Sequence, residues 1–174
     1  MRERYRCIAR VEKSHGKRGE VVTVPVHGLP AVLSEGMEVC VVPPPLKGER
    51  RHVVESCETD GREGALVSLS GIDGIDAAKK LCGRYLLVRE AELPEGFDLH
   101  DGVRLVGREV VDEKVGLRGR VDEVMTGPAN DVWVVALEGG GEVLLPVIDQ
   151  VVSDVPDYGP IAVRATGFYS SEGL

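Results

Sequence analysis

Short apolar runs separated by glycine and proline extend along the whole chain, and they limit what it can fold into. Apolar residues alternate or cluster within the runs, as in Glu20–Val26, which is typical of β-strands with a buried face. The 22 glycines and 10 prolines supply turns between the runs. The sequence therefore predicts an all-β protein.

In the first half the pattern predicts six strands: Cys7–Val11, Glu20–Val26, Glu38–Val42, Arg51–Cys57, Ala65–Ser70 and Arg84–Val88. One short helix interrupts them. Asp73 can cap it, Asp76 completes a sequence that resembles a capping box, and Gly83 is a natural stop. One apolar helix face is predicted, formed by Ile75, Ala78 and Leu81. Six strands with one helix suit a small closed barrel, which has no exposed sheet edge.

The pattern breaks around Glu90–Val103, where prolines and glycines stand among acidic residues. Six more strands are then predicted: Leu105–Val111, Gly119–Met125, Val132–Leu137, Glu142–Pro146, Gln150–Val155 and Ile161–Arg164. Gly139–Gly141 predicts a hairpin turn, since glycine tolerates positive φ. We expect a barrel over residues 1–89, a linker over 90–103, a second small β-barrel over 104–165 and a flexible tail over 166–174.

The formal net charge of −8 is divided unevenly along the chain. Residues 1–90 hold 15 Lys+Arg and 13 Asp+Glu, a net of +2, whereas residues 91–174 hold 6 and 16, a net of −10. This division suggests two modules with different partners and excludes a uniformly basic nucleic-acid binder. The first 18 residues carry seven Lys+Arg against two Glu, which is either a partner-binding patch or an ordinary solvated one.

Several classes of protein are disfavoured. No apolar run approaches the roughly 18 residues of a membrane span, and the N-terminus lacks the apolar stretch of a signal peptide, so we expect a soluble, cytoplasmic protein. Neither the histidines nor the cysteines show metal-ligand spacing, so we expect no metal and no cofactor. The cysteines are expected to be small buried hydrophobes, with Cys82 facing the core; they are Cys7, Cys40, Cys57 and Cys82.

Motifs of enzymes are also missing. The sequence has neither a phosphate-binding glycine loop nor a G-x-S-x-G elbow. The adjacent carboxylates of Asp112–Glu113 and Asp122–Glu123 would point to opposite faces of a strand, so they are poor acid–base pairs. A Cys57–His52 dyad stays open as an alternative that nothing supports. We therefore expect a protein that is not an enzyme.

The segment Ser14–Glu20 carries more information, because two glycines bracket two cations in a predicted turn. Glycines let a backbone approach a partner closely, and Lys17 and Arg18 could contact phosphates. His15 adds a group that can stack or form a hydrogen bond. The alternative is a hairpin turn with a charged tip and no partner.

Four stretches, taken in order, resemble the bacterial ribosome maturation factor family RimM. The first runs from Ile8–Val11 to His15–Val21, and the second from Gly71–Asp73 through Ala77, Ala78, Leu81 and Gly83 to Leu86–Val88. The third joins Gly119–Val121 to Gly127–Val135, and the fourth joins Leu144–Pro146 to Ile148–Val155. Together they cover roughly residues 7 to 164, so the chain is identified as similar to this family over nearly its whole length.

The resemblance implies a six-stranded barrel like those of translation factors, followed by a PRC barrel. It also implies a factor that binds the free small (30S) ribosomal subunit and a head protein, the nineteenth of that subunit, and that assists maturation of 16S ribosomal RNA. We therefore expect RNA or ribosome contacts from the basic candidates Arg10, Lys13, His15, Lys17 and Arg18. Contacts with the ribosomal protein are expected from Phe97, Leu99, Leu105, Asn130, Asp131 and Trp133.

The chain departs from the family at one place. The family often carries two adjacent tyrosines before an Asp-Leu-Ile-Gly stretch, and these help partner binding. Here His100–Asp101 would occupy the tyrosine positions and Arg104 stands for the aspartate. The tyrosine contact is therefore not transferred; the surface is either re-formed by Phe97, Leu99 or Trp133, or weakened.

Two of the candidates keep a structural alternative. Asn130–Asp131 either shapes its loop by local hydrogen bonds or contacts the partner. Trp133 is either a core residue or an exposed interface anchor. The main alternative for the whole chain is a generic β-barrel module that binds another protein or RNA and is not tied to the ribosome.

Overall fold

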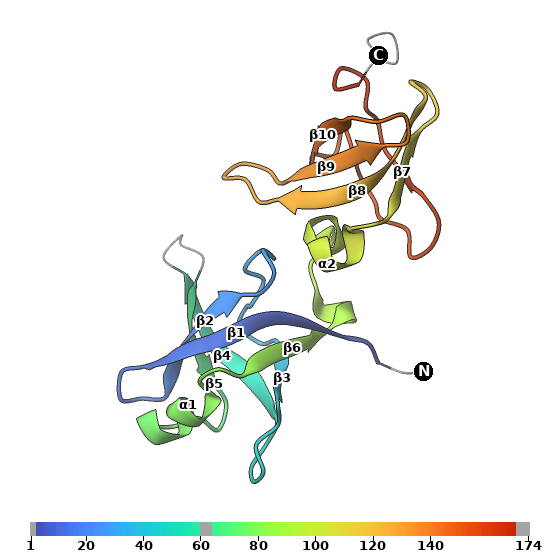
Figure 1. Cartoon of the computed structure of the whole chain (residues 1–174). Coiled ribbons are helices and arrows are strands. Elements are labelled where there is room, and N and C mark those ends of the chain that lie inside the picture. Colours follow the sequence, from blue (N-terminus) through green and yellow to red (C-terminus); the bar gives the residue numbers. More distant parts are fainter. Residues whose placement is uncertain (1–2, 60–63, 170–174) are drawn as a thin grey trace. The chain divides into compact units, whose positions relative to one another are not determined.

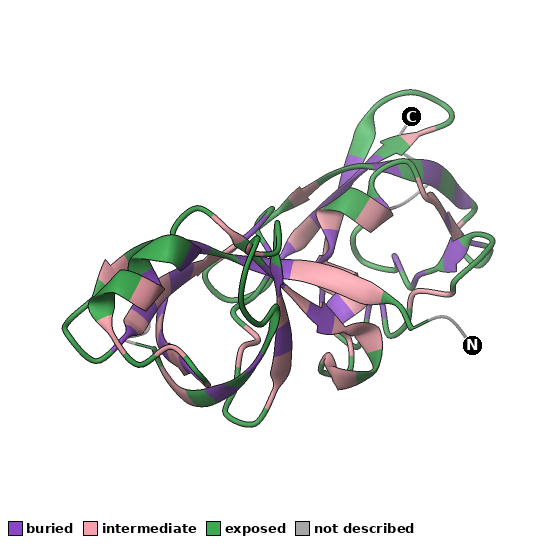
Figure 2. Cartoon of the chain, turned by 90° about the horizontal axis from the view of Figure 1, so that it is seen from below, coloured by how far each residue is buried: buried purple, intermediate pink, exposed green. Residues whose placement is uncertain are grey.

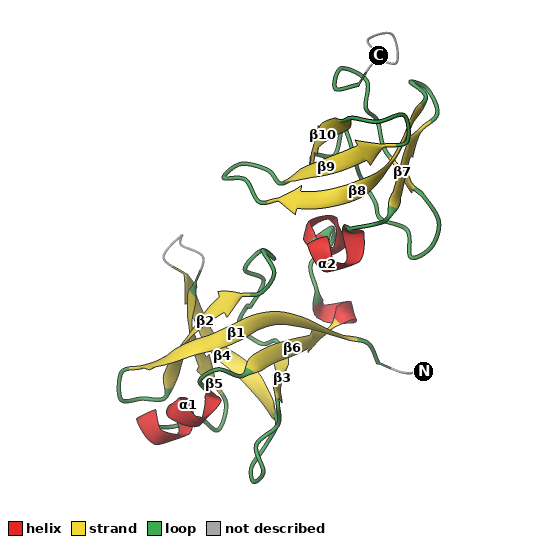
Figure 3. Cartoon of the chain, in the orientation of Figure 1, coloured by secondary structure: helices red, strands yellow, loops and turns green. Residues whose placement is uncertain are grey.

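The computed structural model describes residues 3–59 and 64–169. The chain divides into two compact units, Met1–Pro94 and Glu95–Leu174. Figure 1 labels the elements along the chain, and Figure 3 colours them by type. Both units are built mainly from strands, so the predicted all-β class with a short helix is confirmed.

The first unit is a closed six-stranded barrel in the order β1-β2-β5-β4-β3-β6. Its strands are β1 Tyr5–His15, β2 Glu20–Pro25, β3 Glu38–Val42, β4 Arg51–Thr59, β5 Ala65–Leu69 and β6 Tyr85–Arg89. Buried residues alternate with intermediate or exposed ones along most of them, as Figure 2 shows by colour. The inward side chains are mostly valine and leucine, with Val11, Val21 and Val67 fully buried. This packing follows the pattern expected of half-buried strands.

β1 closes the barrel because it pairs along both of its edges, with β2 and with β6. Its register shifts between Val11 and Lys13 against β2, and between Cys7 and Ala9 against β6. Such bulges bend a strand and increase its twist. The second shift also explains why the neighbours Ile8 and Ala9 are both buried, which simple alternation does not predict.

Helix α1, Ile75–Leu81, packs against β1. The prediction that Asp73 caps it is wrong, because its N-cap is Gly74 and no side chain bonds to the first turn. Ala78 and Leu81 are buried as predicted, whereas Ile75 is 38% exposed. Gly83 ends the turn after the helix with φ of 80°, which confirms its predicted role as the stop.

The second unit is a five-stranded sheet in the order β10-β9-β8-β7-β11. Its strands are β7 Glu109–Asp112, β8 Leu117–Met125, β9 Val132–Leu137, β10 Glu142–Pro146 and β11 Ile161–Ala162. β11 pairs with β7 in parallel, while the other neighbours are antiparallel. One apolar core lies against the sheet, with Trp133, Leu117 and Ile161 among its most buried members.

Three short helical segments precede this sheet: the 3-10 helices η1 Glu90–Glu92 and η2 Phe97–His100, and the helix α2 Gly102–Leu105. Leu105 was expected to begin a strand, but it is the last residue of α2 and packs into the core. The predicted strand at Gln150–Val155 is also wrong. The amides of Val151 and Val152 both donate to the Ile148 carbonyl, and these two neighbouring valines are both buried, as in a turn.

The predicted turn at Gly139–Gly141 is confirmed, since it joins the antiparallel strands β9 and β10 with Gly140 and Gly141 at positive φ. Of the predicted tail, residues 166–169 are described, and Tyr169 packs partly against the core. Residues 170–174 lie outside the described residues.

Replacing Gly119 by alanine is expected to destabilise the second unit by about 1–3 kcal/mol, because the added methyl meets packed atoms. A Cβ at Gly119 would lie 2.4 Å from the Ala136 carbonyl oxygen and 2.8 Å from a Val135 methyl. Urea unfolding followed by the fluorescence of Trp133, the single tryptophan, measures the change in this unit.

Gly139→Ala is the matched control, because a Cβ there has no described neighbour within 4 Å and its φ is not positive. It should change the unfolding free energy by no more than about 0.5 kcal/mol. Equal effects of the two substitutions would contradict the close approach of β8 and β9.

Candidate functional site

The basic loop predicted at Ser14–Glu20 is the tip of the β1–β2 hairpin. His15, Lys17 and Arg18 are all exposed there. Gly19, in contrast, is buried at φ of 97°, and a Cβ on it would lie 2.0 Å from the Ile72 carbonyl oxygen. The hairpin base is therefore pressed against the chain just before α1, which holds the cationic tip in place.

The cations of the tip differ in their partners. Arg18 Nη2 lies 3.4 Å from Glu20 Oε1, so part of its charge is neutralised. Lys17 has no ion pair within the described residues. Lys17 is consequently the more available cation for an anionic partner.

The five basic candidates have different surroundings. Lys13 and His15 line an open hollow of about 700 Å³, together with Glu12 and Glu58. Arg10 lies on the outer face of β1, where it stands opposite Tyr85 of β6. The sequence brought these residues together because they are neighbours in the chain, whereas the barrel places them in different surroundings.

Three candidates for contact with a partner protein are buried. Phe97 is 4% exposed, and Leu105 and Trp133 are fully buried. The indole Nε1 of Trp133 donates to the Leu99 carbonyl at 3.0 Å. The core alternative for Trp133 is therefore correct, and these three side chains present no surface to a partner. Leu99 is partly buried against the same core.

Two segments that the sequence singled out separately meet in the second unit. His100 Nδ1 donates to Asp131 Oδ2 at 2.6 Å, so the position expected for a tyrosine contacts the loop that contains Asn130. The side chain of Asp131 is only 9% exposed, and that of His100 is 32% exposed. The Asp131 carbonyl also accepts from the Val147 amide at 2.8 Å. Asp131 thus shapes its loop, while Asn130 remains exposed.

Beside this pair lies a hollow of about 480 Å³. Leu99, Val147 and Ile148 supply apolar lining, and Glu95 and Asp149 supply negative charge. His100 lies at the same hollow. A lining that combines apolar and acidic residues suits a partner that offers both apolar and cationic side chains.

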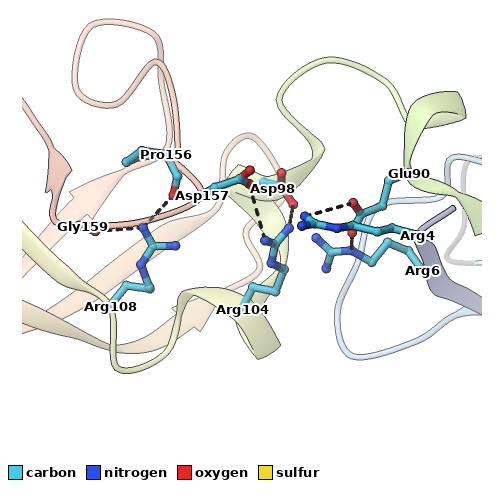
Figure 4. Close-up of polar contacts among 9 residues, drawn as sticks. All are labelled: Arg4, Arg6, Glu90, Asp98, Arg104, Arg108, Pro156, Asp157 and Gly159. Carbon is cyan, nitrogen blue, oxygen red and sulfur yellow. Dashed lines mark hydrogen bonds and ion pairs between the residues drawn. The ribbon is translucent and has the colours of Figure 1, made fainter. Parts of the chain in front are cut away.

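Arg104, the residue expected at an aspartate position of the family, lies among acidic side chains. Its Nη1 is 3.1 Å from Asp98 Oδ1 and its Nη2 is 3.9 Å from Asp157 Oδ1, as drawn in Figure 4. Nearby, Arg108 donates to the Pro156 and Gly159 carbonyls at 2.7 and 2.9 Å. These two arginines hold the loop that leads to β11.

In the first unit, Arg6 and Arg4 share one carboxylate. Arg6 Nε lies 2.6 Å from Glu90 Oε1, and Arg4 Nη1 lies 4.0 Å from Glu90 Oε2 (Figure 4). Both cations therefore have an acidic partner within their own unit, unlike Lys17.

The alternative of a Cys57–His52 dyad finds no support. The His52 ring nitrogens lie within hydrogen-bond distance of the Ser70 and Glu49 carbonyls, and the Cys57 thiol donates to the Leu33 carbonyl. Asp112, one of the adjacent carboxylates, accepts from the amides of Ala165 and Lys114. Each of these side chains is therefore occupied by hydrogen bonds to the main chain.

Residues 3–59 and 64–169 contain no group of three or more His, Cys, Asp or Glu placed to hold a metal ion. None of the helices in those ranges is long and apolar enough to cross a membrane.

The cysteines are less buried than predicted. Cys82 is exposed rather than facing the core, because it follows the last helical residue and its thiol turns back toward the Ala78 carbonyl, 3.7 Å away. The other three are partly buried. Burial raises the pKa of the Cys7 and Cys57 thiols.

Two features of the structure do not follow from any single segment of the sequence. The His100–Asp131 pair joins segments that the sequence separates, and the surroundings of Arg10 depend on the register between β1 and β6. The sequence signal for the second feature is weak. It consists only of an aromatic residue, Tyr85, at an outward position of a strand.

The chain is similar to known proteins of one family. A model of the RimM N-terminal domain matches residues 6–93. The chain is 32% identical to the ribosome maturation factor RimM of Desulforamulus reducens over 158 residues, covering 89% of this chain and 90% of that protein. It is 31% identical to the factor of the same name from Geobacillus kaustophilus, with 93% and 94% covered. A solved structure of a RimM protein from Pseudomonas aeruginosa is 21% identical, covers 92% of this chain and 96% of that one, and has a TM-score of 0.41.

The thiols should differ in reactivity in the native protein. A small maleimide at neutral pH is expected to modify Cys82 before Cys7 or Cys57, since Cys82 is exposed and the raised pKa of the other two lowers their thiolate fraction. Peptide mapping by mass spectrometry after partial labelling measures the order. Labelling in urea should abolish the difference, and faster native labelling of Cys57 would contradict its burial.

Proposed function

This chain belongs to the RimM family of ribosome maturation factors, and we propose that it assists maturation of the small ribosomal subunit by binding, without catalysis. Its partners are the free small (30S) subunit, through 16S ribosomal RNA, and the head ribosomal protein number nineteen. The factor acts in the cytoplasm, where subunits are assembled.

The division of charge along the chain is the observation that carries this proposal. Residues 1–90 have a net charge of +2, and residues 91–174, which include the whole second unit, have a net charge of −10. RNA is a polyanion, whereas proteins that bind it are rich in cations. A chain whose two units differ in charge suits a partner in which RNA and a basic protein lie side by side.

The hairpin tip supports an RNA contact by the first unit. Its exposed Lys17 has no ion pair within the described residues, and the buried Gly19 fixes the tip to the barrel. A cation held on a rigid support loses little freedom when it meets a phosphate.

The acidic hollow of the second unit supports a protein contact. Glu95 and Asp149 line it, and His100, the residue expected at a tyrosine position of the family, is held there by Asp131. Leu99 is the one apolar member of the predicted protein contacts that remains partly accessible. In this proposal the hollow, instead of a tyrosine pair, contacts the ribosomal protein.

Binding alone can assist assembly. A factor that binds one conformation of an intermediate more tightly than its competitors raises the population of that conformation. With one unit on RNA and the other on protein, the chain favours intermediates in which both partners are correctly placed. No bond needs to be made or broken by the factor.

Sedimentation of a native extract tests the proposal. The wild-type protein should be recovered with free small subunits and not with complete ribosomes. The double variant Lys17→Glu/Arg18→Glu should bind purified small subunits at least about tenfold more weakly, because it reverses the charge that faces phosphate. The difference should shrink as salt is raised.

Lys47→Glu/Arg50→Glu is the matched control, since it makes the same change of charge at two exposed residues elsewhere in the first unit. It should bind close to wild type if position matters and not only net charge. Recovery of the wild-type protein only among light soluble proteins, even after mild crosslinking, would favour a generic β-barrel module instead.

Reversing the charge of the hollow should weaken the protein contact. Glu95→Lys/Asp149→Lys is expected to lower affinity for the isolated head protein about three- to tenfold, mainly through slower association. Surface plasmon resonance measures both rates. Glu138→Lys/Glu142→Lys, at exposed residues of the β9–β10 hairpin, is the control and should bind as wild type. An equal loss in both variants would mean that net charge, not the hollow, determines binding.

A further inference from the structure

A row of four outward residues crosses the first barrel from β2 to β3. The register pairs Arg10 of β1 with Val24 of β2 on one side and with Tyr85 of β6 on the other. Tyr85 is in turn paired with Val42 of β3. The row Val24, Arg10, Tyr85 and Val42, which we call the Tyr85 row, is formed by strands that Figure 1 shows side by side.

The Tyr85 row leaves apolar surface in solvent. Tyr85 is 39% exposed and Val42 is 37% exposed, although inward neighbours such as Leu86 are fully buried. An aromatic ring on the outer face of a sheet is not needed to fill the core. It is, however, well placed to stack on a flat partner group.

Cations lie in the chain segment that precedes Tyr85 and on the paired strand β1. Lys79 and Lys80 are exposed in the last turn of α1, and Arg84 directly precedes Tyr85. Arg84 Nε donates to the Lys80 carbonyl at 2.8 Å and its Nη1 donates to the Pro43 carbonyl, so its guanidinium is held in place. A Cβ on Gly83 would lie 4.0 Å from Arg10 Nη2, so the Arg10 guanidinium extends toward the end of the same helix.

These cations differ from other arginines of the barrel in their partners. Arg51 of β4 and Arg89 of β6 form ion pairs with glutamates. Among the described residues, Arg10, Lys79 and Lys80 form no ion pair. Their charge is therefore not neutralised by the chain itself. An exposed ring amid unpaired cations is complementary to a ligand that combines flat apolar groups with negative charge.

We propose that the Tyr85 row is a binding surface for single-stranded RNA, with a base stacked on Tyr85 and the flanking phosphates near Arg10, Lys79 and Lys80. Single-stranded nucleic acid joins flat bases to a phosphate backbone, and proteins bind it by combining aromatic side chains with Arg and Lys. The inference rests on the proposed function in taking RNA as the partner. It places a contact on the sheet face, apart from the hairpin tip.

An acidic or purely apolar protein partner fits the surface less well. The exposed apolar area of the row is limited to one ring and two valines, which is small for a protein interface. An acidic peptide would pair with the lysines but would leave the ring unused. A base with its phosphates engages both kinds of group.

Binding of a fluorescein-labelled single-stranded oligoribonucleotide of about 12 nucleotides, measured by fluorescence anisotropy, tests the inference. Tyr85→Ala should weaken binding about tenfold, and Tyr85→Phe should restore it, since the ring and not the hydroxyl stacks. Arg10→Gln should weaken binding and flatten its dependence on salt. Tyr158→Ala is the control, because Tyr158 is 84% exposed but lies in the second unit, and it should bind as wild type.

The outcomes separate this inference from the proposed function. Wild-type affinity of Tyr85→Ala for the oligonucleotide, or no binding by the wild-type protein, would overturn the inference. Sedimentation with small subunits would then still decide the proposed function on its own. If Tyr85→Ala lost subunit binding but kept its affinity for RNA, the row would be a protein contact, and the inference would again be wrong. Circular dichroism of each variant shows that the barrel is intact.

Discussion

The pairing of β1 with β2 on one edge and β6 on the other is the interaction on which the first unit depends. It closes the barrel, and its two bulges bend one long strand around the core. Because side chains alternate across a strand, the same register decides which residues face outward. Arg10 is brought beside Tyr85 in this way, while Val11, the next residue, is buried. The register of β1 with its two neighbours therefore both closes the barrel around its core and decides which side chains lie on the surface.

In the second unit, hydrogen bonds attach the segment before the sheet to the sheet itself. The Trp133 indole donates to the Leu99 carbonyl, and His100 donates to Asp131. His100, the residue expected at a tyrosine position of the family, thus has a buried acceptor. Arg104, the residue expected at an aspartate position of the family, likewise lies near acidic partners.

Alternation and turn residues were sufficient to predict most of the strands, and the bounds of β3, β9 and β10 coincide with the predictions. The errors arose where contacts between distant segments decide the outcome. Gln150–Val155 has the composition of a strand, but it forms a turn whose valines pack into the core. The candidate site was predicted less well, because nearness in sequence suggested that the basic residues act together. Their positions depend on strand register and bulges, which composition does not reveal.

The parallel pairing of β11 with β7 affects how the chain can fold during synthesis. The residues of β11 complete the core of the second unit, yet they are made after all of its other strands. The last strand of the first barrel, β6, is made far earlier and meets β1 within the first half. Since domains fold as units in the order of their synthesis, the first barrel can close while the second waits for its final strand. A nascent chain thus has a finished first barrel before it has a finished second unit.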